Sequence, residues 1–221
     1  MKSDRQLQQD VIDELQWEPA VEATSIGVEV KDGIVTLAGH VENYAQKVAA
    51  EQAAQRVGGV KGVVIEIDIA LSGASKRSDV DIARAASHAL EWNSTVPRNA
   101  VRISVQDGWV TLTGEVSWAF QRWAAVAAVR NLIGVAGVND LIAIKPRIEP
   151  HVAPRDIKTK IEAALQRRAH EETKSIEVGV AGDSVTLSGI VASWAERDAA
   201  RKAAWAAPGV KNVIDNIRVI A

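Results

Sequence analysis

The fold of this chain is decided by the stretch VTLAGHV at residues 35–41, because the sequence contains it twice more in closely related form. The other copies are VTLTGEV at residues 110–116 and VTLSGIV at residues 185–191, so each copy begins 75 residues after the one before it. Self-similarity at a fixed period is the mark of a repeat protein. A unit of this length exceeds the usual solenoid repeat and is long enough to close a small core by itself. We therefore expect three tandem domains.

The residues before this stretch predict a helix and then a strand in every copy. Apolar residues four apart give the helix one apolar side, and they are Leu7, Val11 and Leu15, then Ile82, Ala86 and Leu90, then Ile157, Ile161 and Leu165. Apolar residues two apart predict a strand with one buried face, and they are Ile26, Val28 and Val30, then Val101, Ile103 and Val105, then Ile176, Val178 and Val180. The pairs Asp32-Gly33, Asp107-Gly108 and Gly182-Asp183 follow, which are residue types that tolerate the backbone of a tight turn. The repeated stretch is therefore the second strand of a β-hairpin.

An alanine-rich helix and a third strand complete each copy. The helix begins after an expected N-cap residue, which is Asn43, Ser117 or Ser193 in the three copies. A strand-helix-strand passage returns to the sheet as a right-handed parallel crossover, which makes the sheet mixed. The fold class is thus predicted to be α+β, with three tandem α-β-β-α-β two-layer sandwiches, each a small mixed sheet covered on one face by two helices.

Glycine recurs at two positions of the repeat for backbone reasons. Gly39, Gly114 and Gly189 lie on the inward face of the second strand, where a side chain would obstruct a crossing helix. Gly59, Gly134 and Gly209 follow the alanine-rich helix and are expected to end it. They are not a phosphate-binding loop, because such glycines lead into a helix and do not follow one.

The repeat sets the domain boundaries. We expect domains at residues 1–71, 78–146 and 153–221, with linkers at 72–77 and 147–152. The first linker has a flexible composition, whereas prolines stiffen the second.

Composition restricts the function classes. The net charge of −2 gives no concentrated basic face, so we expect no nucleic-acid partner. The chain contains no cysteine, which removes disulfides and thiol chemistry. No apolar run approaches the length of a transmembrane segment, and the N-terminus lacks the apolar region of a secretory signal. We expect a cytoplasmic location, or a periplasmic one if the native N-terminus differs.

The repeated residues resemble a known family. The strand pattern Val-x-Leu-x-Gly-x-Val, the alanine-rich helix and the Gly-Val-x-x-Val motif before the last strand are similar to the BON domain, three times over. The resemblance implies a stress-associated binding role, since BON domains occur in bacterial osmotic-stress proteins and in outer-membrane lipoproteins that bind anionic phospholipid. A potassium-binding relative pairs a BON domain with a LysM domain, for which this chain has no room.

The sequence contains no recognisable catalytic pattern. No nucleophile with a base, carboxylate pair, metal-ligand spacing or cofactor loop is recognisable, so we expect no enzyme, no metal and no cofactor. The four histidines, His40, His88, His151 and His170, fall at non-equivalent repeat positions. They are interpreted as surface or linker residues.

A basic residue recurs one turn inside the second helix, as Lys47, Arg122 and Arg197. A cation there is disfavoured by the helix dipole unless an anion binds at the same place, so a lipid phosphate or carboxylate is one explanation. The alternative is a solvated charge, such as Lys47 paired with Glu51.

Tryptophan is used seven times, against one phenylalanine and one tyrosine. Trp118, Trp123 and Trp194 cluster near the basic position, where exposed rings beside cations suit a membrane interface. The alternative is that they fill a core or a contact between domains. Trp17 and Trp92 end first helices and are expected to cap the core.

The leading hypothesis is a non-enzymatic stress-associated protein that binds anionic phospholipid surfaces through repeated weak sites. The second hypothesis is a scaffold or chaperone-like holdase without lipid binding, with a client protein or self-association as its partner. The third is binding of potassium or another small ligand.

Overall fold

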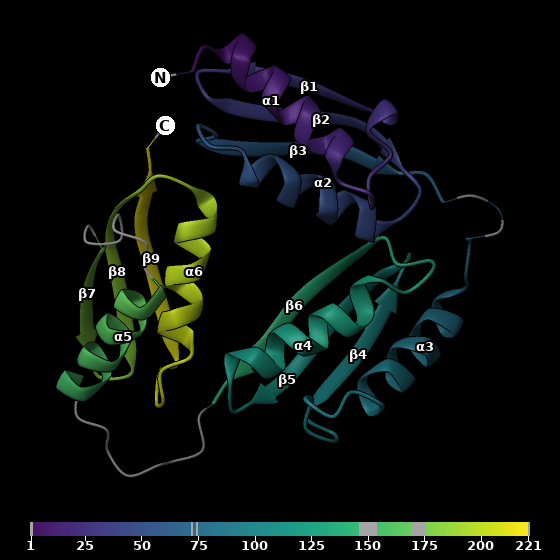
Figure 1. The fold of residues 1–221 in the computed structure, drawn as a ribbon. Helices are drawn as coiled ribbons and strands as arrows, with labels where there is room; N and C mark the ends of the chain where they lie inside the picture. The colour runs from purple at the N-terminus through teal and green to yellow at the C-terminus, as the bar shows by residue number, and fades with distance from the viewer. Residues whose placement is uncertain (1, 72, 74, 146–153, 169–175, 221) are drawn as a thin grey trace.

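A computed structural model shows the fold and describes residues 2–71, 73, 75–145, 154–168 and 176–220. Every repeat follows the same order of elements (Figure 1). The first repeat contains α1 (Asp4–Trp17), a short 3₁₀ turn (Ala23–Ser25), β1 (Ile26–Lys31), β2 (Ile34–Val41), α2 (Tyr44–Arg56) and β3 (Gly62–Ile69). The second contains α3 (Asp79–Glu91), β4 (Val101–Gln106), β5 (Trp109–Val116), α4 (Ala119–Arg130) and β6 (Gly137–Ile144). The third contains α5 (Pro154–Arg168), β7 (Ile176–Ala181), β8 (Ser184–Val191), α6 (Trp194–Trp205) and β9 (Asn212–Val219).

Each repeat forms its own three-stranded sheet, and the predicted α+β class is confirmed. In the first sheet, β2 lies between β1, its antiparallel neighbour, and β3, its parallel neighbour, and the other two sheets repeat this order. Val35 and Leu37 are fully buried under the two helices, together with apolar residues of α1 and α2. Three separate cores result, one in each repeat. The linker at residues 147–152 lies outside the described residues.

The hairpin turns are closed as the sequence predicts. Asp32 and Gly33 both have positive φ, 54° and 80°, as the central residues of such a turn require. The carboxylate of Asp4, the first residue of α1, accepts hydrogen bonds from both of their amides, at 2.9 and 3.1 Å. Asp79 binds the turn at Asp107 in the same way. The first helix is therefore tied to the hairpin through its N-terminal turn in two of the repeats.

The repeated strand glycine has a different cause from the one expected. Gly39 has a φ of 139°, and a Cβ there would collide with the carbonyl oxygen of Ser25, the residue before β1. Gly114 has the same relation to the carbonyl of Ala100. The obstacle to a side chain is thus the backbone of the neighbouring strand, and the expected crossing helix is not the obstacle.

The ends of the second helix confirm most of the expected residues and correct one. Asn43 and Ser193 accept hydrogen bonds from Gln46 N and Glu196 N as N-caps. The N-cap of α4 is Trp118 and not Ser117, because the second repeat has no short polar side chain at this position. The Gln121 side chain instead accepts from the amides of both residues, at 3.0 and 3.1 Å.

The glycines that were expected to end the second helix lie a few residues beyond its end. The helix α2 already ends at Arg56, and Gly59 follows with a φ of 105° in the turn that leads into β3. Gly134 and Gly209 also have positive φ, at 92° and 86°. The left-handed backbone at these residues explains why the repeat keeps glycine there.

The three repeats are arranged around a common centre, with α1, α3 and α5 on the outer side (Figure 1). The helices α2 and α6 are in contact. Tyr44, the first residue of α2, packs against the core of the second repeat. Trp194, the first residue of α6, binds the carbonyl oxygen of Val60 in the first repeat. The same repeat position thus makes both contacts, which defines a head-to-tail arrangement.

Candidate functional site

The three repeated basic residues all reach from the second helix to the last strand of their own repeat. Lys47 Nζ donates a hydrogen bond of 2.7 Å to the carbonyl oxygen of Ile67. Arg122 Nε lies 2.6 Å from a carboxylate oxygen of Asp140 in β6. Arg197 Nε lies 2.9 Å from the equivalent carboxylate of Asp215 in β9. The structure therefore gives each cation an internal partner, and the Lys47–Glu51 pair is not among the ion pairs of the described residues.

The side chains of the two arginines nevertheless remain partly exposed to solvent. The side chains of Arg122 and Arg197 are 32% and 25% exposed. Their carboxylate partners also orient the last strand, because Asp140 and Asp215 each accept from the amide two residues ahead, at 3.1 Å. An anion that binds at either arginine would share it with a carboxylate already in place. No local sequence pattern predicts this pairing, because each acid lies 18 residues from its base.

Trp194 lies between Arg197 and the first repeat. Its Nε1 donates to Val60 O at 2.9 Å, and the guanidinium carbon of Arg197 lies 4.8 Å from its ring centroid. The ring is half-buried. In this arrangement Trp194 serves as a contact between repeats, which is one of the two interpretations left open by its position.

The aromatic residues at the start of α4 remain on the surface. Trp118, Phe120 and Trp123 are all exposed. The rings of Trp118 and Phe120 stack, with centroids 6.4 Å apart and an angle of 28° between their planes. The first and third repeats have no aromatic residues at these three positions. The group of rings is therefore a feature of the second repeat alone.

Trp17 and Trp92 do not cap the core, contrary to expectation. They are 82% and 89% exposed, because each stands at the very end of its helix, beyond the last core residue of the apolar stripe. They occupy equivalent positions, 75 residues apart, and Arg167 holds that position in the third repeat. They are single rings on the surface of two different repeats, and their recurrence at one repeat position makes them candidates for an interaction surface.

The other two tryptophans pack within their own repeats. Trp109 lies over Gly137 on the open face of its sheet, where any Cβ at Gly137 would collide with the ring. Trp205 packs against the core of the third repeat.

Oppositely charged side chains meet at the C-terminal end of α1. Arg56 reaches across from α2 and binds Glu14 at 2.8 Å and Glu18 at 2.7 Å. Hydrogen bonding to this guanidinium lowers the pKa of Glu18 below its ordinary value, and the same contacts, led by the one with Glu14, raise the pKa of Arg56. The arrangement is a charge clamp between two helices.

Within residues 2–71, 73, 75–145, 154–168 and 176–220, no group of three or more histidine, aspartate or glutamate side chains is placed to hold a metal ion. None of the helices in these segments is long and apolar enough to cross a bilayer.

The fold is a tandem array of small two-layer domains joined head to tail. Exposed aromatic rings and paired charges recur on the surface of these domains. The BON domain profile matches residues 3–70, 78–146 and 155–221. The chain therefore belongs to the BON domain family, which confirms the resemblance in its sequence. BON domains are known to bind phospholipids and occur in stress-associated proteins, and the family is generally non-catalytic.

Similarity to individual known proteins is low. A search of curated proteins gave no match. Among solved structures, the C-terminal domain of CdsD, a structural protein of the type III secretion system of Chlamydia trachomatis, is 12% identical with a TM-score of 0.28, and the alignment covers 100% of both chains. A second CdsD structure is 13% identical with a TM-score of 0.27, covering 98% of this chain and 92% of that one. Similarity at this level carries no argument about function.

Proposed function

We propose that the protein is a non-enzymatic, stress-associated binding protein that attaches peripherally to anionic phospholipid surfaces. The observation that carries this proposal is the pair Trp17 and Trp92, which are repeated at one structural position and almost fully exposed. Tryptophan at the end of a helix, with its polar Nε1 and large apolar ring, suits the boundary between lipid headgroups and hydrocarbon. Family membership supports the same ligand class.

The head-to-tail arrangement supports joint use of these residues. The contacts of Tyr44 and Trp194 hold the three repeats in one assembly. In this proposal Trp17 and Trp92 supply two rings for the interface, and Arg167 supplies one cation for lipid phosphate. Three weak sites held at fixed spacing bind a surface far more tightly than one.

The surface at the second helix is proposed as a further contact. Trp118 and Trp123 are exposed beside Arg122, so they can reach headgroups without rearrangement. Lys47, Arg122, Arg197 and Trp194 already have partners within the chain, and they would take part only by exchanging those partners for lipid. We rank these four below Trp17 and Trp92. A cytoplasmic location remains part of the proposal.

Sedimentation with liposomes of stated composition tests the proposal. Binding is expected to rise with the phosphatidylglycerol content of phosphatidylcholine vesicles and to fall with salt. Trp17→Ala with Trp92→Ala is expected to weaken binding about tenfold or more, since each ring buries a large apolar area at the interface. The matched control is Trp109→Ala, which removes a tryptophan that packs on its own sheet. Equal binding by the double variant and the control would overturn the proposed surface.

A protein-binding scaffold or holdase is the second candidate, and the contact of Trp194 with Val60 favours it. That contact shows the start of the second helix packing on another BON domain, which a domain of a partner could also do. Suppression of client aggregation by a protein that ignores anionic liposomes would support this function over lipid binding.

A further inference from the structure

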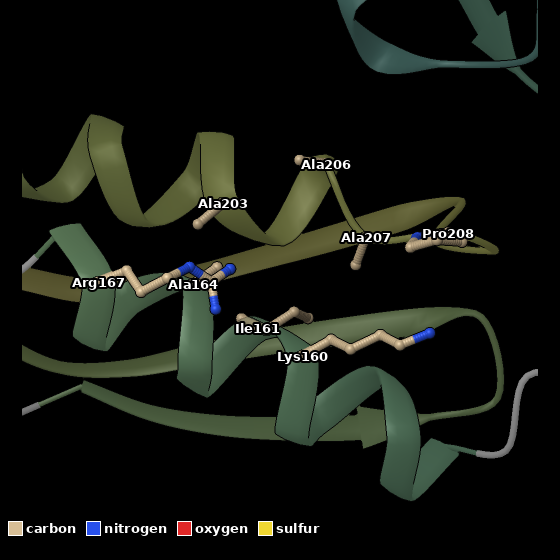
Figure 2. A pocket seen from close by; sticks show the side chains of 8 residues that line it. All are labelled: Lys160, Ile161, Ala164, Arg167, Ala203, Ala206, Ala207 and Pro208. Atoms are coloured by element: carbon tan, nitrogen blue, oxygen red, sulfur yellow. The ribbon is translucent and has the colours of Figure 1, made fainter.

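A groove of about 410 Å³ lies between α5 and α6 in the third repeat (Figure 2). Its floor is apolar, and two cations, Lys160 and Arg167, stand on its rim. The remaining lining residues are Ile161, Ala164, Ala203, Ala206, Ala207 and Pro208. A mainly apolar hollow of this volume with a few polar groups is typical of sites for small molecules.

The first repeat explains why the groove is open. At the position of Ala206 it has Arg56, whose guanidinium crosses from α2 to α1 and binds Glu14 and Glu18. Ala164 stands where the first repeat has Glu14. The third repeat has therefore lost both the side chain that spans the two helices and a carboxylate that holds it.

The charge of the groove is also reversed between the repeats. Lys160 stands at the position of Asp10, and Arg167 at that of Trp17. No ion pair is recorded for either cation among the described residues of the third repeat. They are seven residues apart on α5, which is two turns or about 10 Å along one side of the helix. Figure 2 shows the Arg167 guanidinium beside Ala164 and the Lys160 side chain extending toward the Pro208 end.

We propose that this groove binds a small single-chain amphipathic anion. The carboxylate pairs with the planar guanidinium of Arg167, which can donate two parallel hydrogen bonds. The hydrocarbon body lies along the alanine floor toward Pro208, and Lys160 adds a second positive charge to the same rim. The ligand is a monomer from solution, because a bilayer lipid would have to withdraw its chain from hydrocarbon to occupy the floor. The groove shares Arg167 with the proposed membrane surface, so each proposal is tested with its own probe, decanoate in solution for the groove and vesicles for the membrane surface.

Calorimetric titration of the full chain with decanoate, below the concentration at which it forms micelles, tests the proposal. Decanol and acetate are the matched probes, since each keeps only one half of the ligand. The expected result is saturable one-site binding of decanoate that neither probe reproduces. Arg167→Gln with Lys160→Gln is expected to weaken binding about tenfold or more, through the loss of charge-assisted contacts.

Two further variants separate the groove from general effects of charge. Ala206→Arg with Ala164→Glu restores both the arginine of the first repeat and a carboxylate that holds it across the groove; Ala206 is exposed and Ala164 is only partly buried, so the core tolerates the change. This variant is expected to abolish decanoate binding while its thermal unfolding stays near that of the wild type. Lys158→Gln with Lys202→Gln removes two cations of the same helices that pair with Glu162 and Asp198, and it should bind normally.

Three results would contradict the proposed groove. Decanoate binding at wild-type strength by the variant with Ala206→Arg and Ala164→Glu, or decanol binding as tight as that of decanoate, would overturn the proposed site. No heat of binding with the wild-type protein would do the same. None of these results bears on attachment to vesicles, which is measured separately.

Discussion

The indole Nε1 of Trp194 donates a hydrogen bond of 2.9 Å to the carbonyl oxygen of Val60, 134 residues earlier in the chain. This contact joins the third repeat to the first, which no linker connects directly. Together with Tyr44 on the second repeat, it holds the three domains as one assembly. The arrangement matters for function because it decides whether Trp17, Trp92 and Arg167 can meet one surface.

We expect Trp194→Ala to loosen the contact between the first and third repeats. The change removes both the hydrogen bond and the ring under Arg197. Because the chain has no cysteine, spin labels can be placed on cysteines substituted for the exposed Gln52 and Ala195. Electron-spin distance measurements should show one narrow distribution before the change and a broad one after it. A distribution as narrow with Trp194→Ala as with the control Trp123→Ala would contradict a role for this contact.

Asp79→Ala is expected to destabilise the second repeat by about 1–2 kcal/mol, because two hairpin amides lose their acceptor. Urea unfolding of the whole protein, followed by tryptophan fluorescence, measures the effect. Glu91→Ala, at the other end of the same helix, is the control and should lie within about 0.5 kcal/mol of the wild type. The third repeat has Pro154 at the equivalent position, so no such variant is available there.

Gly114→Ala is expected to cost about 3 kcal/mol, because the new Cβ collides with the carbonyl of Ala100 and the residue has a φ of 131°. Gly62→Ala provides the contrast, since a Cβ there meets nothing within 4 Å. Chemical unfolding of the two variants compares them directly. Similar stability of both would show that the backbone collision relaxes without cost.

The charge clamp at Arg56 predicts a dependence of stability on pH. Its hydrogen bond lowers the pKa of Glu18 in the folded state, so the folded protein binds that proton less readily than the unfolded chain. The stabilisation is therefore complete above the unfolded value of about 4.3 and is lost as the pH falls through the lower folded value.

Thermal unfolding of Arg56→Ala and of the wild type between neutral and acidic pH measures this contribution. The difference in melting temperature between them is expected to shrink in acid. A difference that stays constant from pH 7 to pH 3 would contradict the assignment. The third repeat has no equivalent clamp, since Ala206 replaces the arginine there.

Sequence periodicity predicted the repeats, the order of elements and most of the core because these depend on local pattern. Leu7, Val11 and Leu15 had to share one face of a helix, and all three are buried. The strand glycine was also correctly placed, although its cause was not, since the carbonyl of Ser25 approaches it only after the sheet has formed. Trp17 and Trp92 were misplaced because a periodic stripe gives no sign of where the core beneath a helix ends.

Three α-β-β-α-β domains and their family follow from local sequence patterns, because helix and strand periods, turn residues and positive-φ glycines act over a few residues each. Which charges are paired, which rings are exposed and which repeats touch depends on how the folded elements pack. Arg122 meets Asp140, Trp194 meets Val60, and the α5–α6 groove opens beside Ala206 through the packing of distant segments. Such contacts depend on how complete elements dock, and no local pattern encodes that docking.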